Sequence, residues 1–302
     1  MERVGSPEQV LFDVKEKEER VHVFLEREGL DALVIGRQDN FAWLTAGGDN
    51  RVITTSEMGF GFLVLTKDRK WLVSHSMDGQ RFIEEQAHGQ GYEMVTSYWH
   101  QASPEQKVLS LTRGMRVGAD FALEGTRQYG PELVNLHYPL TPLDLQRCRW
   151  IGKTANRILT AVALDLQPGM TEQEVAARLL YEYALEGLTI DVLIVGFDDR
   201  IQRYRHPMPT DNALQRYALL HPAARRWGLH ANVTRSVHFG EPPTNTKRAM
   251  DGVATIGGHI ATMLAPGVAF ADILTEQIRL YRELGYSTEW MYHFQGGITG
   301  YT

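Results

Sequence analysis

The second half of the chain contains a sequence repeat whose two copies are 98 residues apart. Pro168-Gly169 recurs as Pro266-Gly267, and Gly187 recurs as Gly285. In each copy a helical pattern stops at the Pro-Gly pair and a second helical pattern stops at the later glycine, because these residues end helices. Three further identities keep the same step: Ala163 with Ala261, Leu166 with Leu264, and Tyr183 with Tyr281. This agreement predicts a duplicated helix-turn-helix-strand unit and a pseudo-twofold domain.

The two copies of this unit differ in length. The first copy continues from Gly187 through a strand at 190–196 to a strand pair that ends near Gly240. An equal course in the second copy would reach about residue 338, whereas the sequence ends at Thr302. The repeat therefore predicts a second domain that is shortened and incomplete, with one sheet edge left unpaired.

The first half of the chain has the pattern of a compact α/β domain. A helical stripe follows Pro7 and stops at Gly29, and a strand is expected at 32–35. A hairpin is expected across 60–75 and a further strand near 115–119. The pair of prolines at 139 and 142 marks the boundary between a domain at 1–140 and a domain at 143–302. The expected fold class is therefore α/β (α+β).

Composition excludes several classes of partner. The 302 residues are 43% hydrophobic and 23% charged, which suits a globular protein of two domains. A net charge of -6 gives no basic surface for nucleic acid, so we expect a small-molecule or short peptide ligand. No run of about 18 apolar residues predicts a membrane span, and the charged N-terminus favours a cytoplasmic protein. The single Cys148 predicts an inert thiol.

Several ordered motifs carry a resemblance to a known group of proteins. They are PGMTEQEVAARLLYEYALEG at 168–187, HP at 206–207, NVTRSVHFG at 232–240 and HFQGGITGY at 293–301. Together they resemble the creatinase, prolidase and aminopeptidase P superfamily, and NFAWLTAGG at 40–48 is similar to its N-terminal domain. The resemblance implies a ribonuclease H-like N-terminal domain, a pita-bread C-terminal domain, here shortened, and a homodimer.

The same resemblance places the family's metal-ligand positions on unsuitable residues. Metallopeptidase members have two Asp ligands eleven residues apart, which fall here on His221 and Asn232. The third ligand, a His, falls on Gly297, and two Glu ligands would lie beyond Thr302. Carboxylates are what hold two hard divalent ions close together. We therefore expect no metal cofactor, with a divalent metal such as Mn or Co as the alternative.

Two histidines remain as candidates for catalysis. His206 stands where family enzymes keep a His that faces the substrate, and His293 is the first His of the second motif. Creatinase-like members act without metal and use such histidines as general acid and base. An imidazole suits that role near neutral pH. The hypothesis is that His206 relays a proton and that His293 binds or polarises the substrate.

Three further residues are candidates for substrate binding: Tyr204, Arg235 and His238. Because side chains alternate between the two faces of a strand, His238 shares a face with Thr234 and Ser236. The sequence does not decide whether this face points towards the pocket or away from it. For Arg235 a structural ion pair is the stronger interpretation. His221 and His230 are expected to be structural or exposed, with His230 in a turn between strands.

These residues favour one function and leave two others open. The first hypothesis is a metal-independent hydrolase of a C-N bond in a small amide, amidino or peptide-like compound. The alternatives are a metal-dependent Xaa-Pro aminopeptidase or dipeptidase, and a non-catalytic homologue that binds a small ligand. HExxH, CxxC and GxSxG motifs do not occur, so zinc protease and serine hydrolase readings have no support.

Overall fold

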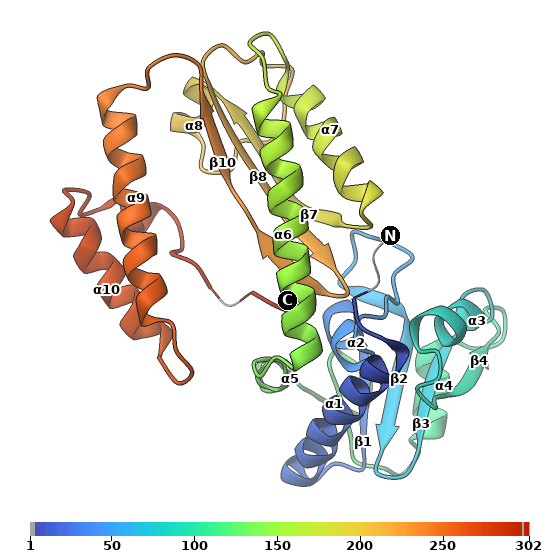
Figure 1. The fold of residues 1–302 in the computed structure, drawn as a ribbon. Helices are drawn as coiled ribbons and strands as arrows, with labels where there is room; N and C mark the ends of the chain where they lie inside the picture. The colour runs from blue at the N-terminus through green and yellow to red at the C-terminus, as the bar shows by residue number, and fades with distance from the viewer. Residues whose placement is uncertain (1–3, 298, 302) are drawn as a thin grey trace.

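A mixed sheet forms the centre of the first domain in the computed structural model, which describes residues 4–297 and 299–301 (Figure 1). Its strands run in the order β4-β3-β2-β1-β5-β6. The strands are β1 (Ala32–Arg37), β2 (Met58–Thr66), β3 (Lys70–His75), β4 (Glu93–Ser97), β5 (Val117–Ala119) and β6 (Arg127–Gln128). β1, β2 and β3 are antiparallel neighbours, whereas β5 pairs with β1 in parallel. The predicted hairpin and the strand after it are confirmed.

Helices cover this sheet and bury its apolar side chains. They are α1 (Pro7–Glu28), α2 (Gln38–Leu44), α3 (Gly79–Arg81), the π-helical turn η1 (Phe82–Gln86), α4 (Pro104–Leu111) and α5 (Pro131–His137). Local sequence fixes both ends of α1. The Ser6 hydroxyl accepts from the Gln9 amide in a capping box at one end, and Gly29 adopts a φ of 66° at the other. The expected helix from Pro7 to Gly29 is confirmed.

The second domain begins as an antiparallel sheet with two helices on one face. Its first elements are α6 (Pro142–Leu164), α7 (Glu172–Leu185), β7 (Thr189–Phe197), α8 (Asp199–Arg203), β8 (Tyr217–Arg226), β9 (Leu229–Asn232) and β10 (Arg235–His238). The strand order is β10-β8-β7, and β9 also pairs with β8. α6 and α7 lie against these strands, and Ile158 and Leu179 are buried on the helix side with Leu220 and Ala224 of β8.

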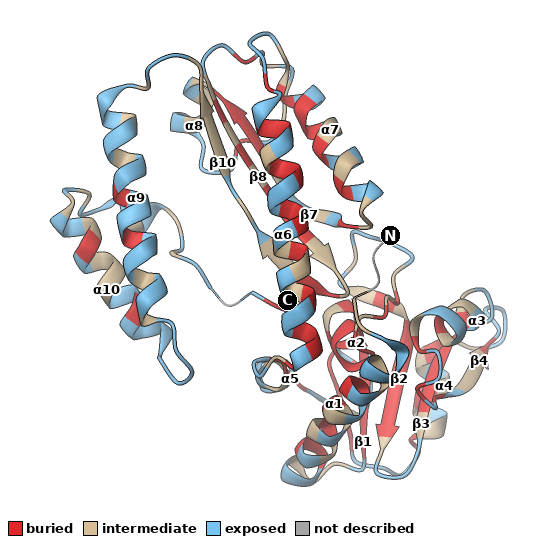
Figure 2. Ribbon diagram, in the orientation of Figure 1, coloured by how far each residue is buried: buried red, intermediate tan, exposed pale blue. Residues whose placement is uncertain are grey.

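The second copy of the repeat is a helix pair of matching dimensions. It consists of α9 (Thr244–Met263) and α10 (Phe270–Glu283), followed by the 3-10 turn η2 (Glu289–Tyr292). Both ends of α10 lie 98 residues after the ends of α7 at 172 and 185. The duplicated helix pair is confirmed. Figure 2 shows α9 and α10 as largely exposed, in contrast to α6; α9 buries only Gly252 and Ile256 among its described residues.

A buried cluster of polar side chains joins the two domains. The ammonium of Lys17 on α1 lies 2.6 Å from Asp13 Oδ2 and 2.9 Å from Asp144 Oδ1 on α6. The Tyr301 hydroxyl donates to the same Asp144 oxygen at 2.6 Å. All four side chains are buried. The charges are compensated inside the protein, so the loss of one partner leaves a buried charge that destabilises the fold.

Among the described residues, every helix is too short or too polar to span a membrane.

His137 lies beside this cluster, and its burial leads us to expect that stability depends on pH. Burial lowers the pKa of His137 to about 4, and its Nε2 has no hydrogen-bond partner. The unfolded chain binds this proton near pH 6.5 and the folded chain only near 4, so the free energy of unfolding should fall as the pH drops between these values. The expected loss is about 3 kcal/mol. Urea unfolding at several pH values measures it.

The variant His137→Phe isolates this contribution. Burial raises the pKa of Asp120 to about 6, and this acid acts in the opposite sense because its protonation favours the folded state as the pH falls. The wild-type total therefore mixes both groups, whereas the difference between wild type and His137→Phe reports His137 alone. Equal slopes of stability against pH in the two proteins would show that His137 is protonated normally.

Candidate functional site

The two predicted catalytic histidines lie in direct contact. His206 Nε2 is 2.9 Å from His293 Nε2, and the ring centroids are 5.0 Å apart at an interplanar angle of 79°. His206 belongs to the loop between α8 and β8, whereas His293 directly follows η2. The structure thus brings together residues that are 87 positions apart in the sequence.

The surrounding contacts assign the protons of this pair. His293 Nδ1 lies 2.6 Å from the carbonyl oxygen of Phe294, which can only accept. His293 Nδ1 therefore carries the hydrogen, and in the neutral ring Nε2 carries the lone pair. His206 must then donate its Nε2 hydrogen to His293. The pair consists of one hydrogen-bond donor and one acceptor.

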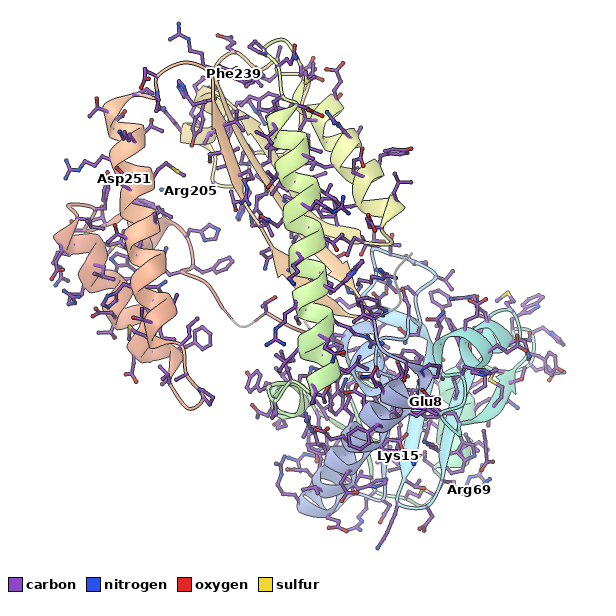
Figure 3. All side chains as sticks on the ribbon, in the orientation of Figure 1. Glu8, Lys15, Arg69, Arg205, Phe239 and Asp251 are labelled. Atoms are coloured by element: carbon purple, nitrogen blue, oxygen red, sulfur yellow. The ribbon has the colours of Figure 1, made fainter. Side chains whose placement is uncertain are left out.

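Contacts on either side hold the two rings opposite each other. Arg205 Nη2 forms an ion pair with Glu289 Oε2 at 2.9 Å, one residue before His206 on one side and four before His293 on the other. Figure 3 labels Arg205 in the space between α9 and the sheet. The Gln295 side-chain amide donates to the His293 carbonyl at 2.8 Å. These neighbouring contacts help to fix the positions of both rings, so the arrangement of the pair does not depend only on the hydrogen bond between them.

His221 forms the third imidazole of the site. It lies on β8, and its Nδ1 is 2.8 Å from the Thr234 hydroxyl. Burial lowers the pKa of His221, and the charges of His206 and His293 lower it further. His221 therefore remains neutral at pH 7 beside the pair. Sequence reasoning expected a structural or exposed residue at this position, and Thr234 was not recognised as its partner.

The family's metal-ligand positions do not provide a metal site. Asn232 ends β9 and is exposed, and Gly297 has no side chain to donate. With His221 these residues contain no carboxylate, which a pair of hard divalent ions requires. Over residues 4–297 and 299–301, no group of three or more His, Cys, Asp or Glu side chains is arranged to hold a metal ion. The donor set does not fit a dinuclear metal, so no chemical step is assigned to one.

The three predicted substrate-binding residues form contacts with groups other than the two catalytic histidines. Tyr204 is exposed at the end of α8, with the Arg200 guanidinium 5.3 Å from its ring centroid. Arg235 bonds to the side chains of Asn156 and Thr160 on α6. His238 Nδ1 lies 3.0 Å from the carbonyl oxygen of Gly240. Their roles in substrate binding stay predictions, and the partners of the Arg235 side chain on α6 are neutral groups rather than the carboxylate of the expected ion pair.

His230 was expected in a turn, and this expectation was wrong. The residue lies within β9, opposite Arg225 of β8. Its Nε2 is 2.9 Å from Asp191 Oδ2, and its Nδ1 is 3.0 Å from the Gly300 carbonyl oxygen. The turn is confined to Trp227 and Gly228, which both adopt positive φ values of 56° and 79°. A two-residue turn of this kind lets the strands extend up to it.

Comparison with known proteins agrees with this architecture. The sequence model of metallopeptidase family M24 matches residues 146–301. Dipeptidase PepE from Mycobacterium ulcerans superposes with a TM-score of 0.77 at 18% identity, over 96% of this chain and 82% of that one. The prolidase from Pyrococcus horikoshii OT3 gives 0.76 at 15% identity, over 95% and 82%.

A third similar structure belongs to a subunit of a multiprotein complex. The N-terminal domain of FACT complex subunit SPT16 from Cicer arietinum (chickpea) gives a TM-score of 0.65 at 11% identity, over 91% of this chain and 78% of that one. No curated protein sequence matches the chain. At these identities the structural likeness establishes the fold, a mixed α/β architecture of the pita-bread type.

Proposed function

Since this chain belongs to metallopeptidase family M24, a family of peptidase-like hydrolases, we propose that it hydrolyses a C-N bond in a small amide, amidino or peptide-like compound without a bound metal. The observation that supports the proposal is the hydrogen bond of 2.9 Å between His206 and His293. A neighbouring donor and acceptor are what general acid-base hydrolysis of such a bond needs.

The proton positions suggest how the pair would work. His293 Nε2 carries a lone pair and would accept a proton from the attacking water, whose oxygen bonds to the substrate carbon. His206 Nε2 carries a hydrogen, and the ring, acting as an imidazolium, would give it to the leaving nitrogen as the C-N bond breaks and become a neutral imidazole. After one turnover His293 would hold one proton too many and His206 one too few. Transfer along the direct contact between the two Nε2 atoms would then restore the starting state.

Hydrolysis in the presence of a chelator tests this proposal. The substrates to compare are Xaa-Pro dipeptides, simple amides and guanidino compounds, with release of amine or ammonia as the measurement. We expect cleavage of one class to persist in EDTA and to be unchanged by added Mn²⁺ or Co²⁺. Activity that appears only with added metal, together with one or two metal ions per chain by mass spectrometry, would establish the metal-dependent Xaa-Pro peptidase instead.

The non-catalytic homologue remains a second candidate. It is favoured by one observation, the likeness in fold to the SPT16 domain, which is a subunit of the FACT complex. A small ligand that binds by calorimetry and is never converted would support it. We further propose that the protein acts as a homodimer on a small molecule or short peptide, and light scattering of the purified chain measures the oligomeric state.

A further inference from the structure

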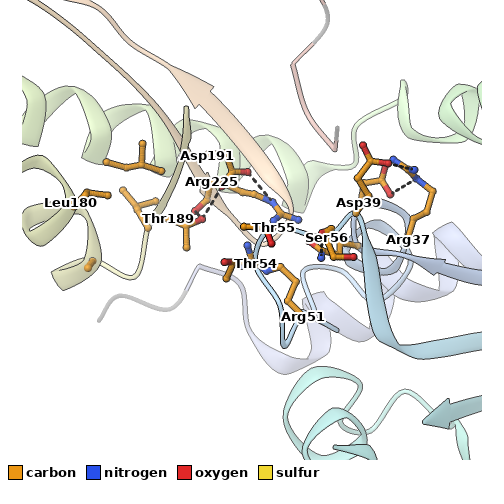
Figure 4. Close-up of a pocket in the computed structure, with 15 residues that line it drawn as sticks. Arg37, Asp39, Arg51, Thr54, Thr55, Ser56, Leu180, Thr189, Asp191 and Arg225 are labelled. Atoms are coloured by element: carbon orange, nitrogen blue, oxygen red, sulfur yellow. Dashed lines mark hydrogen bonds and ion pairs between the residues drawn. The ribbon is translucent and has the colours of Figure 1, made fainter. Parts of the chain in front are cut away.

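A cavity of about 910 Å³ lies between the two domains and away from the histidine pair. Figure 4 shows that side chains from the loop after α2, from α7 and from β7 and β8 surround it. One side is polar and includes Arg51, Arg225 and the hydroxyl groups of Thr54 and Thr55. The other side is apolar and is formed by Leu180, Ala184, Leu188 and Ile190. None of the three site histidines lines the cavity.

Arg225 is the residue of this cavity that most favours a bound ligand. Its side chain is only 11% exposed, and its Nε is buried without a hydrogen-bond partner. The nearest carboxylate oxygen, Asp191 Oδ2, lies 3.7 Å from Nε, beyond hydrogen-bond distance. That oxygen already accepts from His230 Nε2 at 2.9 Å. A buried donor nitrogen that lacks an acceptor is costly, and a ligand that supplies an acceptor is stabilised in turn.

The other arginines of the cavity have their own acceptors. Arg51 forms a forked ion pair with Asp49, with contacts of 2.9 and 2.7 Å. Arg37 lies 3.3 Å from Asp39 and 2.7 Å from Glu57. Arg225 is thus left with a buried Nε that has no hydrogen-bond acceptor. Burial lowers its pKa, and the charge of Arg51 lowers it further, so a negative group placed beside Arg225 would relieve both effects.

The shape and lining of the cavity define the class of ligand. A planar guanidinium fork recognises a carboxylate through two parallel hydrogen bonds. The apolar side offers a surface for a hydrocarbon body, and the volume lies in the range of small-molecule sites. We propose that this interdomain cavity binds a small amphipathic carboxylate, with the carboxylate on Arg225 and the apolar body against Leu180, Leu188 and Ile190. This site is separate from the three site histidines, since none of them lines the cavity and Arg225 follows His221 by four residues, roughly 13 Å along β8.

Isothermal titration calorimetry on the full chain tests the proposal without any need for turnover. The probes are octanoate, its uncharged counterpart octanamide, and acetate, which lacks the apolar body. We expect octanoate to bind with one site per chain and at least tenfold more tightly than either of the other two. The variant Arg225→Gln should weaken octanoate by about tenfold to a hundredfold, as expected for loss of charge-assisted hydrogen bonds.

Two further variants keep the test decisive if Arg225→Gln does not fold correctly. Leu180→Ser changes a half-exposed side chain on the apolar side and should weaken octanoate by about threefold to tenfold while leaving thermal unfolding unchanged. Arg116→Gln removes an exposed arginine that is paired with Asp31 in the first domain and should leave binding unchanged. Octanoate that binds no better than octanamide, or equally well to wild type and to both cavity variants, would overturn the proposal.

Discussion

Replacing His206 with alanine is expected to lower kcat/KM for the cleaved substrate by a factor of about 10²–10⁴. The variant removes the Nε2 hydrogen that His293 accepts at 2.9 Å and that would pass to the leaving nitrogen. His206 is exposed, so the loss should occur without a change in the free energy of unfolding. Steady-state kinetics beside a urea titration separates the two effects.

A matched control and a conservative variant sharpen this test. His100→Ala removes another exposed histidine, on the turn after β4, and should leave kcat/KM at the wild-type value. His206→Gln keeps a side-chain N-H donor that cannot gain or lose a proton near neutral pH. It should retain the affinity for substrate while kcat falls and its dependence on the ionisation of His206 disappears. Full activity in His206→Ala would rule out the proposed role.

Replacing Asp144 with alanine is expected to lower the free energy of unfolding by about 3–5 kcal/mol. The change removes the carboxylate that lies 2.9 Å from the Lys17 ammonium and accepts the Tyr301 hydroxyl at 2.6 Å. Lys17 is fully buried, so its charge would lose one of its two acidic partners without gaining water. Urea unfolding at pH 7 measures the loss.

Two other substitutions test whether the buried charge is the cause. Asp165→Ala removes an exposed carboxylate at the end of the same helix, where it pairs with Arg178, and should cost only about 0–1 kcal/mol. The triple variant Asp13→Leu, Lys17→Met, Asp144→Ala removes all three buried charges and should recover part of the stability lost in Asp144→Ala. A triple variant that is less stable than Asp144→Ala would instead assign the loss to packing.

Local signals account for the parts of the fold that were predictable from the sequence. The capping box of Thr171 with Glu174 marks the start of α7, and the matching glycines at 187 and 285 mark where each second helix stops. These signals act between residues a few positions apart, so the sequence displays them directly. The step of 98 residues then reproduced both ends of α10.

The site itself depends on contacts that no local pattern encodes. Arg205 and Glu289 are 84 positions apart, and no motif near either residue predicts that they interact. The turn at Trp227 required a non-glycine residue at a φ of 56°, which sequence preferences disfavour. The unpaired Nε of Arg225 could not be predicted for the same reason, because it depends on which acceptors the fold leaves out of reach.

The buried cluster around Lys17 also has a meaning for the order of events during folding. Its contact with Tyr301 closes a loop of 284 positions, and its contact with Asp144 a loop of 127. Closing long loops costs chain entropy that only later contacts repay. Because the Tyr301 hydroxyl binds both Lys17 and Asp144, we expect it to take its place after α1 and α6 have met. Until that last step Lys17 and Asp144 have one partner fewer, and the junction between the domains is completed by the end of the described chain.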